Sequence, residues 1–251
     1  MSEPIAFFSD VHGCPDALKA VLDSISSRGV ARMIFLGDVL GYGPEPVECV
    51  RMLKARADVC LMGNHDAMAT DEEFDLSGFS GEIAIPLEFA RRTLAPEEKQ
   101  WLAGLPLTWA GEGIQASHAS LHNPVLFIHV DSAERARQHL SRQSAPISFF
   151  GHTHLPVIYG MDARGRLRMA PGEEGEILLG GQDRYAVGVG SVGFSRDGDP
   201  RACWVEFRPD IPSVVFHRVE FDHASTEIRT GRFLVAESKG QTSQQKNPGS
   251  G

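Results

Sequence analysis

The sequence predicts an α/β (α+β) protein in which two β-sheets pack face to face and helices cover their outer sides. Apolar, strand-like runs alternate with helix-like stretches up to about residue 140, an order typical of right-handed crossovers onto a partly parallel sheet. After Pro146 the chain changes to short strands separated by turn residues. Because no linker rich in Pro, Gly or Ser divides the chain, we expect one domain over residues 1–238.

The first half is expected to supply strands and helices in alternation. The Cys14–Ser27 stretch has apolar residues in the 3.6-residue rhythm of a helix that lies on a sheet, and Gly29 follows as a stop signal. Prolines begin the last two expected helices, where they suit a first helical turn. In chain order the expected elements are the strand Ile5–Ser9, the helix Cys14–Ser27, the strand Met33–Leu36, the helix Pro46–Arg56, the strand Val59–Met62 and the helices Pro86–Leu94 and Pro96–Leu102.

The second half is expected to consist of strands, because short apolar runs are separated there by clusters of Gly, Pro and Asp. These strands are Ile147–Phe150, Val157–Tyr159, Leu167–Ala170, Glu176–Leu179, Tyr185–Val189, Ala202–Phe207 and Val214–Phe221. Residues 239–251 are rich in Gln, Ser, Gly and Asn and have no apolar face, so we expect a disordered tail.

The composition is that of an ordinary globular protein, with 42% hydrophobic and 23% charged residues. A net charge of −9 without a Lys/Arg block argues against nucleic acid as a partner. No segment approaches about eighteen consecutive apolar residues, and the N-terminus has no basic region, so we expect neither membrane insertion nor secretion. The four cysteines form no C-x-x-C pair and indicate reduced thiols in a cytoplasmic protein.

Metal-binding residue types occur where the expected strands end. They form five clusters, at Asp10-Val11-His12, Gly37-Asp38, Gly63-Asn64-His65-Asp66, Ser117-His118 and Gly151-His152-Thr153-His154. Because ligands of open α/β sheets bind beyond the carboxyl ends of the strands, we expect all five clusters to converge on one crevice. If the backbone is extended, Asp10 and His12 point to the same side, and so do His152 and His154. The glycine that precedes three of these clusters would let the backbone turn tightly there.

The types of ligand also carry chemical information. Imidazole nitrogens together with carboxylate oxygens suit Mn, Fe, Zn, Co or Ni, whereas an all-oxygen site would suit Mg or Ca. Two cations about 3.5–4 Å apart need a bridging carboxylate and can hold both the attacking and the leaving oxygen of a phosphoryl transfer. Asp38 is the natural bridge, because its own cluster holds no second ligand. Motifs of serine hydrolases, P-loop proteins and zinc proteases are absent, which leaves hydrolysis at phosphorus as the expected reaction.

In the order of these clusters, the sequence resembles the calcineurin-like metallophosphoesterases over roughly residues 5 to 220. It looks closest to their small bacterial and archaeal phosphodiesterase branch, which shares Gly41-Tyr42-Gly43-Pro44 and Gly190-Ser191-Val192-Gly193. The resemblance implies a four-layer αββα sandwich of two mixed β-sheets flanked by helices.

The resemblance also implies a role for each site residue. The first metal would be held by Asp10, His12, Asp38 and His154, and the second by Asp38, Asn64, His118 and His152. His65 would lie beside the substrate and protonate the leaving oxygen, with Asp66 available to orient it. The two divalent metal ions would be Mn, Fe, Zn, Ni or Co, with Mn as the ion expected to support activity.

We therefore expect a metal-dependent phosphoric ester hydrolase that cleaves a small phosphodiester or phosphomonoester by attack of a metal-bridging hydroxide. Two alternatives are a non-catalytic metal-binding scaffold on the same fold and a phosphoprotein phosphatase. A scaffold can lose His65 or a ligand without penalty, whereas this sequence keeps every one. The substrate, the native metals and the oligomeric state do not follow from the sequence.

Two departures from the family pattern concern substrate fit. Cys14 stands where the family commonly has Asn, and Gly188-Val189 replaces the Asn-Pro that usually precedes Gly-Ser-Val-Gly. The segment around Phe74 and Phe79 is interpreted either as a lid over the site or as an ordinary surface loop. The histidines without a partner motif are interpreted as surface or satisfied interior residues; they are His122, His129, His139, His217 and His223.

Overall fold

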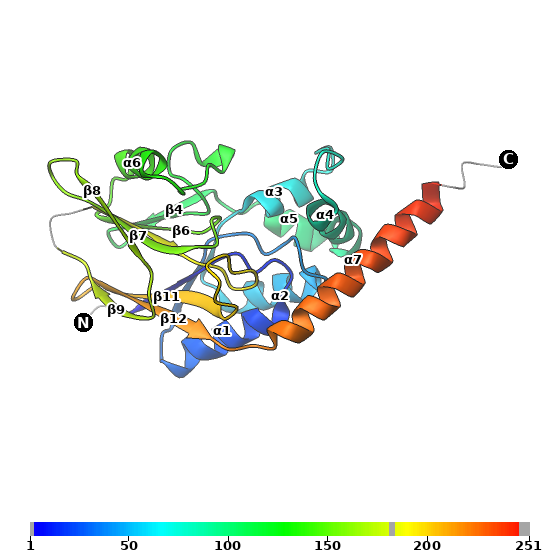
Figure 1. The fold of residues 1–251 in the computed structure, drawn as a ribbon, viewed down its shortest axis with the longest axis horizontal. Coiled ribbons are helices and arrows are strands. Elements are labelled where there is room, and N and C mark those ends of the chain that lie inside the picture. The colour runs from blue at the N-terminus through cyan, green and yellow to red at the C-terminus, as the bar shows by residue number, and fades with distance from the viewer. Residues whose placement is uncertain (1–2, 181–183, 246–251) are drawn as a thin grey trace.

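Two mixed β-sheets form the middle of the molecule (Figure 1), in a computed structural model that describes residues 3–180 and 184–245. In spatial order, the first sheet contains β12 (Ser213–Val219), β11 (Ala202–Arg208), β1 (Ile5–Phe8), β2 (Arg32–Phe35) and β3 (Val59–Cys60). The second contains β4 (Thr108–Gly111), β5 (Ile114–Ser117), β6 (Ile147–Phe150), β10 (Arg184–Val189), β7 (Pro156–Met161) and β8 (Leu167–Pro171). The short strand β9 (Gly175–Leu178) lies beside β12.

Each sheet combines three parallel strands with antiparallel ones. In the first sheet β1, β2 and β3 run parallel, and β11 and β12 pair antiparallel beyond β1. In the second sheet β5, β6 and β10 run parallel, while β4, β7 and β8 are antiparallel. Parallel neighbours bring their carboxyl ends to the same edge, so both sheets can deliver side chains to one place.

Three apolar clusters separate the layers of the sandwich. Successive residues of a strand point to opposite faces, and along β1 Phe7 faces the second sheet whereas Phe8 faces the helices. The Phe7 ring stacks on Phe149 of β6 with centroids 3.7 Å apart, which places both in the core between the sheets. Phe150, the next residue of β6, packs on the other side, in a cluster with Leu140. The predicted αββα layering is therefore confirmed.

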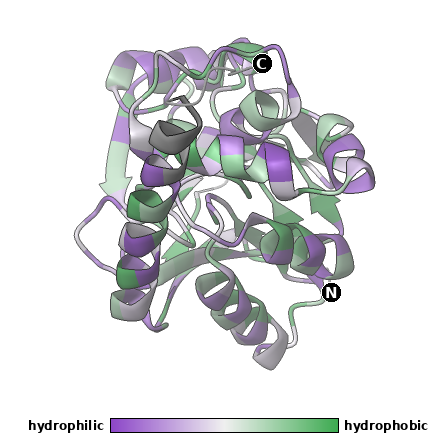
Figure 2. Cartoon of the chain, turned by 90° about the vertical axis from the view of Figure 1, so that its right-hand side faces the viewer, coloured by the Kyte–Doolittle hydropathy of each residue, from purple (hydrophilic) through white to green (hydrophobic). Residues whose placement is uncertain are grey.

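Helices cover both outer faces. The first sheet is covered by α1 (Pro15–Ser27) and α2 (Pro46–Arg56), and the second by α6 (Ala133–Arg142). Further helices, α3 (Asn64–Thr70), α4 (Gly81–Thr93) and α5 (Pro96–Ala103), lie together at one end (Figure 1). Figure 2 shows hydrophilic and hydrophobic residues mixed along these outer helices, as expected of elements that bury one side only.

Several elements of the fold differ from the prediction. The α4 helix begins at Gly81, so Pro86 lies inside it rather than in its first turn, and that part of the prediction is wrong. The helices α3 and α6 and the strands β4 and β5 were not predicted from the sequence, and neither was α7 (His223–Gln245). The α7 helix packs on α4 and extends beyond the sandwich (Figure 1). The tail predicted at residues 239–251 overlaps the end of α7, and its last residues, 246–251, lie outside the described part of the chain.

No helix within the described residues is both long and apolar enough to span a membrane.

Candidate metal centre

The predicted metal ligands converge at the edge where the parallel strands of both sheets end. Asp10, Asp38 and Asn64 follow β1, β2 and β3 of the first sheet, and His118 and His152 follow β5 and β6 of the second. All but Asn64 are buried, and they bring potential ligand atoms within 4.8 Å of one another in three overlapping groups. These groups are Asp10, His12 and His154; His12, Asp38 and His65; and Asp38, His118 and His152.

Asp10, His12 and His154 form one side of the cluster. The Nε2 atom of His154 lies 3.4 Å from Asp10 Oδ1 and 3.1 Å from His12 Nε2. Three donor atoms this close have the spacing of ligands around a common cation. Asp10 also joins the two sheets, because its Oδ2 accepts the backbone N–H of His152 at 3.0 Å.

Asp38 lies between this side and the opposite one. Its Oδ2 is 3.8 Å from His12 Nε2 and 3.3 Å from His118 Nε2. Around His118, the same Nε2 lies 3.2 Å from both Asn64 Oδ1 and His152 Nδ1. One carboxylate oxygen within reach of both donor groups is the geometry that a bridging ligand requires.

The backbone of the ligand loops is strained rather than extended. A positive φ occurs at Asp10 (59°), His12 (50°), Asp38 (62°), His152 (64°) and His154 (59°). The expectation that extended backbone aligns Asp10 with His12 and His152 with His154 is therefore wrong, and left-handed turns aim these side chains instead. Long-range hydrogen bonds hold the strain at Asp10, whose carbonyl accepts Ser191 Oγ–H at 2.9 Å and Gly193 N–H at 3.0 Å. The Gly190–Gly193 motif thus supports a ligand turn.

Close approach, more than turning, explains two of the glycines that precede ligands. A Cβ atom on Gly63 would lie 2.1 Å from Asp38 Oδ1, and one on Gly151 would lie 2.7 Å from Asp10 Oδ2. Among the three glycines that directly precede predicted ligands, only Gly37 combines such crowding with a positive φ, of 114°. The missing side chains therefore make room for carboxylates that come from other strands.

Hydrogen bonds behind three imidazole rings fix which nitrogen faces the cluster. The Nδ1–H of His12 donates to Leu40 O at 2.7 Å, and that of His118 donates to Leu36 O at 3.1 Å. His154 Nδ1–H donates to Phe194 O. Because a carbonyl can only accept, each Nδ1 carries the proton and each Nε2 keeps a lone pair for a metal.

The electrostatics of the cluster suit cations. Burial alone would raise the pKa of Asp10 and Asp38, but neighbouring histidines outweigh it and hold both values well below the usual range. Burial lowers the pKa of His12 and lowers that of His152 to about 3, so both rings are neutral. Burial alone would lower the pKa of His118 too, but Asp38 and Asp10 raise it to about 9. Metal ligation needs ionised carboxylates and neutral imidazoles, and Asp10, Asp38, His12 and His152 are already in those states. His118 would release a proton when a cation binds, and with that release the residues fit divalent cations.

His65 and Asp66 have separate surroundings. His65 is buried beside His12, with ring centroids 4.8 Å apart, and its Nδ1 has no hydrogen-bond partner among the described residues. Burial lowers its pKa. Asp66 does not orient His65, contrary to the prediction: its carboxylate accepts the backbone N–H groups of Asp38 (2.8 Å), Leu40 (3.1 Å) and Gly63 (3.1 Å). Asp66 instead ties the Asp38 loop to the start of α3.

Three residues near the cluster were not assigned a role from the sequence. His129 was interpreted as a surface or satisfied interior residue, and the structure places its ring 3.9 Å from that of His152 between centroids. Tyr42 packs edge-on against His12 at 4.6 Å, and its hydroxyl accepts from Arg196 Nη2 at 3.2 Å. Their positions depend on tertiary contacts, and the signal in the sequence was that Tyr42 belongs to the motif Gly41-Tyr42-Gly43-Pro44 shared with the family.

Three other residues that the sequence singled out have well-defined surroundings. His139 and His217 are satisfied interior or partly buried side chains, as predicted, bonded to Ser148 Oγ at 2.8 Å and Glu206 Oε2 at 3.0 Å. Cys14 is fully buried in the apolar cluster beneath α1, and burial raises its pKa to about 12. Its thiol is therefore a packing group rather than a reactive one.

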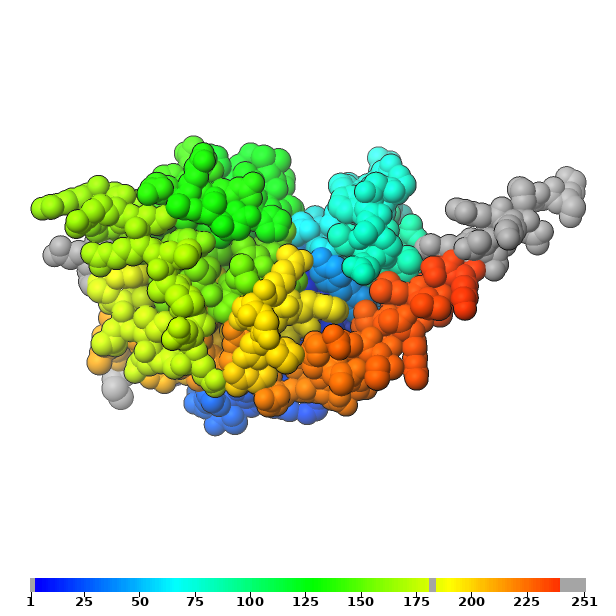
Figure 3. Space-filling model, viewed as in Figure 1, coloured from blue at the N-terminus to red at the C-terminus, as the bar shows by residue number. Residues whose placement is uncertain are grey.

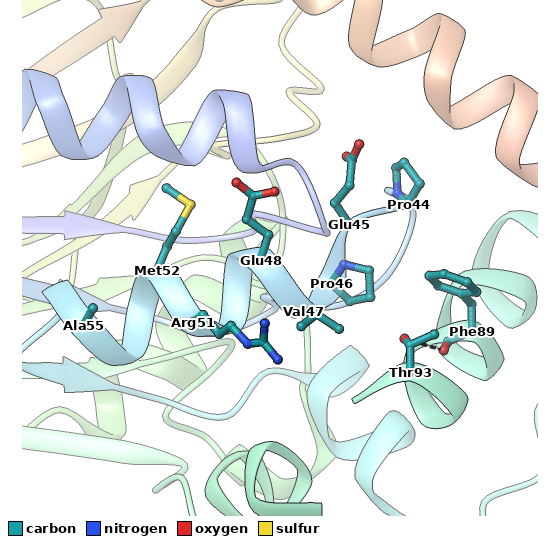
Figure 4. Close-up of a pocket in the computed structure, with 10 residues that line it drawn as sticks. All are labelled: Pro44, Glu45, Pro46, Val47, Glu48, Arg51, Met52, Ala55, Phe89 and Thr93. Atoms are coloured by element: carbon teal, nitrogen blue, oxygen red, sulfur yellow. Dashed lines mark hydrogen bonds between the residues drawn. The ribbon is translucent and has the colours of Figure 1, made fainter. Parts of the chain in front are cut away.

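A groove of about 760 Å³ lies away from the donor cluster, between α2 and α4. Figure 4 shows Val47 of α2 and Phe89 of α4 on its two sides. None of the predicted metal ligands is among the described residues that line it. The chemistry therefore belongs to the donor cluster at the strand ends.

Comparison with known proteins gives a consistent relationship. The sequence model of the Calcineurin-like phosphoesterase family matches residues 3–156. An uncharacterized protein of Methanocaldococcus jannaschii is 30% identical over 224 residues, which cover 87% of this chain and 88% of that protein. The crystal structure of a metallophosphoesterase from Sphaerobacter thermophilus superposes with a TM-score of 0.79 at 29% identity, covering 95% of this chain and 99% of that one. A symmetrical bis(5'-nucleosyl)-tetraphosphatase of Pseudomonas fluorescens is 40% identical over 60 residues, 23% of this chain and 21% of that protein.

Proposed function

The chain belongs to the calcineurin-like phosphoesterase family, and on that premise we propose that it hydrolyses a small phosphoester with the help of two divalent cations. The observation that carries the proposal is the position of Asp38, whose Oδ2 lies within 3.8 Å of a donor on either side. A single-metal site would not need a buried carboxylate shared in this way. The complete set of donors also favours an enzyme over a non-catalytic scaffold.

The ligands divide as the family resemblance implies. Asp10, His12, Asp38 and His154 would hold one cation, and Asp38, Asn64, His118 and His152 the other. When bound, such a pair acidifies a water molecule and neutralises charge on the phosphoryl oxygens. The mixture of imidazole and carboxylate donors suits Mn, Fe, Zn, Ni or Co, and we propose Mn as the ion that supports activity.

The protein's own residues then position and protonate the substrate. His65 lies beside His12 and Asp38 with an unpartnered Nδ1, and we assign it the proton that the leaving oxygen receives. An anionic phosphoester beside the ring would favour the protonated imidazole and offset the effect of burial on its pKa. Asp66 acts through backbone N–H groups, by fixing the loop from which the Asp38 carboxylate projects.

The test is reconstitution of metal-stripped protein with Mn, Ni, Co, Zn or Mg, followed by assays of an aryl phosphodiester and an aryl phosphomonoester. We expect turnover to return with Mn, Ni or Co and to stay low with Mg, since Mg disfavours imidazole ligands. Failure of every metal to restore hydrolysis of either ester would contradict the proposal and favour the scaffold. The variant His223→Gln, which changes a histidine outside the cluster, serves as the control and should match the wild type.

A further inference from the structure

A cleft opens directly beside the second group of donors. It encloses about 710 Å³, and Asn64 and His152 line its inner end. Figure 3 shows the hollow between the cyan surface of residues near 75 and the green surface of residues near 125. A volume of this size is in the range of small-molecule sites, which bind most of a ligand's surface.

The two walls of this apolar cleft come from segments far apart in the sequence. One wall is α3 and the loop after it, with Met68, Phe74 and Phe79. The other is the single 3₁₀ turn at Pro124–Leu126, with Val125, Leu126 and the following Phe127. Among the described lining residues, Asp71 is the only carboxylate, and none is Lys or Arg. The cleft is therefore a mostly apolar pocket with two predicted metal ligands, Asn64 and His152, in its lining.

Each wall of the cleft has a defined conformation. The guanidinium of Arg91 on α4 donates through Nη2 to the carbonyls of Met68 (2.6 Å), Asp71 (2.7 Å) and Phe74 (3.0 Å), which pins the first wall. In the second wall Asn123 and Phe127 have positive φ angles of 60° and 46°, a strained backbone for residues other than glycine. The Phe127 ring meets the ring of the predicted ligand His118 edge-on at 5.9 Å between centroids.

Large apolar side chains stand exposed on both walls. Phe74 and Phe79 are 36% and 39% exposed, and Val125 and Leu126 are 60% and 62% exposed. Binding of an apolar group between two apolar surfaces is favourable, because it removes apolar surface from water. Phe74 and Phe79 contact each other with ring centroids 5.9 Å apart, so they present a continuous surface to such a group.

A second pocket adjoins the donor cluster at His12, against which the rings of Tyr42 and Phe194 pack edge-on. It encloses about 390 Å³, and Tyr42, Phe194, Ser195 and Arg196 line it together with Glu82, Thr230 and Leu234. Arg196 is held there by its hydrogen bond to the Tyr42 hydroxyl. This pocket therefore offers one cationic and one anionic side chain, whereas the apolar cleft has no cation among its described lining residues.

We infer that the apolar cleft binds an uncharged ring substituent of the phosphoester, and that the substrate is a phosphodiester with its second, polar substituent toward Arg196. This inference rests on the proposed function, since the donors must hold the phosphate. A polyphosphate chain does not fit the cleft, because no cation lines it among the described residues. We therefore interpret Phe74 and Phe79 as part of a wall that selects the substrate, rather than as a lid over the site.

The test uses calorimetric binding of phenylphosphonate and methylphosphonate to the Mn-loaded protein. These probes share the anionic head group and differ only in the ring, so the ratio of their affinities reports the cleft alone. We expect phenylphosphonate to bind about tenfold more tightly, because a partly buried ring adds apolar contact. In Leu126→Ser this ratio should fall toward one, while methylphosphonate affinity stays unchanged. Leu178→Ser, which alters a leucine of similar exposure on β9, is the matched control.

The outcomes separate the two proposals. Equal affinity of the wild type for both probes would overturn the ring pocket and leave the proposed function standing. If neither phosphonate bound, the phosphate-binding role of the donors, and with it this inference, would be overturned. A wild-type dimer that Leu126→Ser converts to a monomer would assign the cleft to a second copy of the chain instead. Competition by a set of nucleoside and simple aryl phosphodiesters would then distinguish which ring the cleft prefers.

Discussion

The donor cluster and the apolar cleft meet at Asn64 and His152, yet they are built in opposite ways. The donors lie at buried strand ends, in strained turns that backbone hydrogen bonds from other loops hold in place. The cleft walls are exposed, apolar and pinned at few points. The difference teaches that the proposed reaction would take place in the tightly held part of the molecule. The proposed choice of substrate would lie in the exposed part.

Removal of the shared carboxylate should have the largest effect. Asp38→Asn keeps the size of the side chain but removes the charge that faces both donor groups, so kcat should fall at least about 10³-fold. Steady-state assays with Mn and an aryl phosphodiester measure this. Asp23→Asn, on the exposed side of α1, is the control. Wild-type turnover by Asp38→Asn would remove the basis for a shared ligand.

Two glycine substitutions compare the regions directly. Gly63→Ala places a Cβ 2.1 Å from Asp38 Oδ1, which must displace that carboxylate, and we expect activity to drop on the order of 100-fold. Gly78→Ala adds the same methyl group in the loop of the cleft wall, where a Cβ has nothing within 4 Å. That variant should keep wild-type activity. Equal losses of activity in Gly63→Ala and Gly78→Ala would show that the loop of the cleft wall is as constrained as the turns that carry the donors.

A smaller effect is expected where the cleft wall is pinned. Arg91→Met removes three hydrogen bonds to the carbonyls of the α3 loop, so KM for an aryl phosphodiester should rise about fivefold with kcat nearly unchanged. Arg92→Met changes the neighbouring arginine, which pairs with Glu237 of α7, and serves as the control. A fall in kcat without a change in KM would indicate that the loop acts on the reaction itself.

The last prediction concerns stability rather than turnover. His139 accepts the backbone N–H of Leu121 through Nδ1, and burial lowers its pKa to about 3. Below the ordinary pKa of about 6.5 the unfolded chain binds a proton that the folded chain refuses, so stability falls as pH drops through that value. The slope should be about 1.4 kcal/mol per pH unit for this group. Urea unfolding between pH 4 and 7 should show a shallower acid dependence in His139→Gln, and an unchanged slope would contradict the assignment.

Local patterns predicted most strands of the two sheets, although not β4 and β5, and the details of the site less well. The runs at Ile5–Phe8 and Ile147–Phe150 are buried on both faces, because each strand lies between a helix layer and the other sheet. The convergence of the ligands followed from their places after such strands. The positive φ of Asp10 was not predictable, since Ser191 and Gly193 hold it from the far end of the chain.

The same reason explains two residues whose partners were not predicted. Asp66 is adjacent to His65 in sequence, but its partners are backbone groups of another loop, which no local pattern reveals. His129 contacts the ring of His152, from which 22 intervening residues separate it in the sequence. The long helix α7 carries few buried residues, so its sequence lacked the apolar periodicity that marked α1.

The number of Mn ions bound per chain tests the shared-ligand cluster most directly. Equilibrium dialysis of the stripped protein against Mn, followed by elemental analysis, should give two ions per chain for the wild type and fewer for Asp38→Asn. One ion or none in the wild type, or two ions retained by Asp38→Asn, would contradict a dinuclear centre bridged by Asp38.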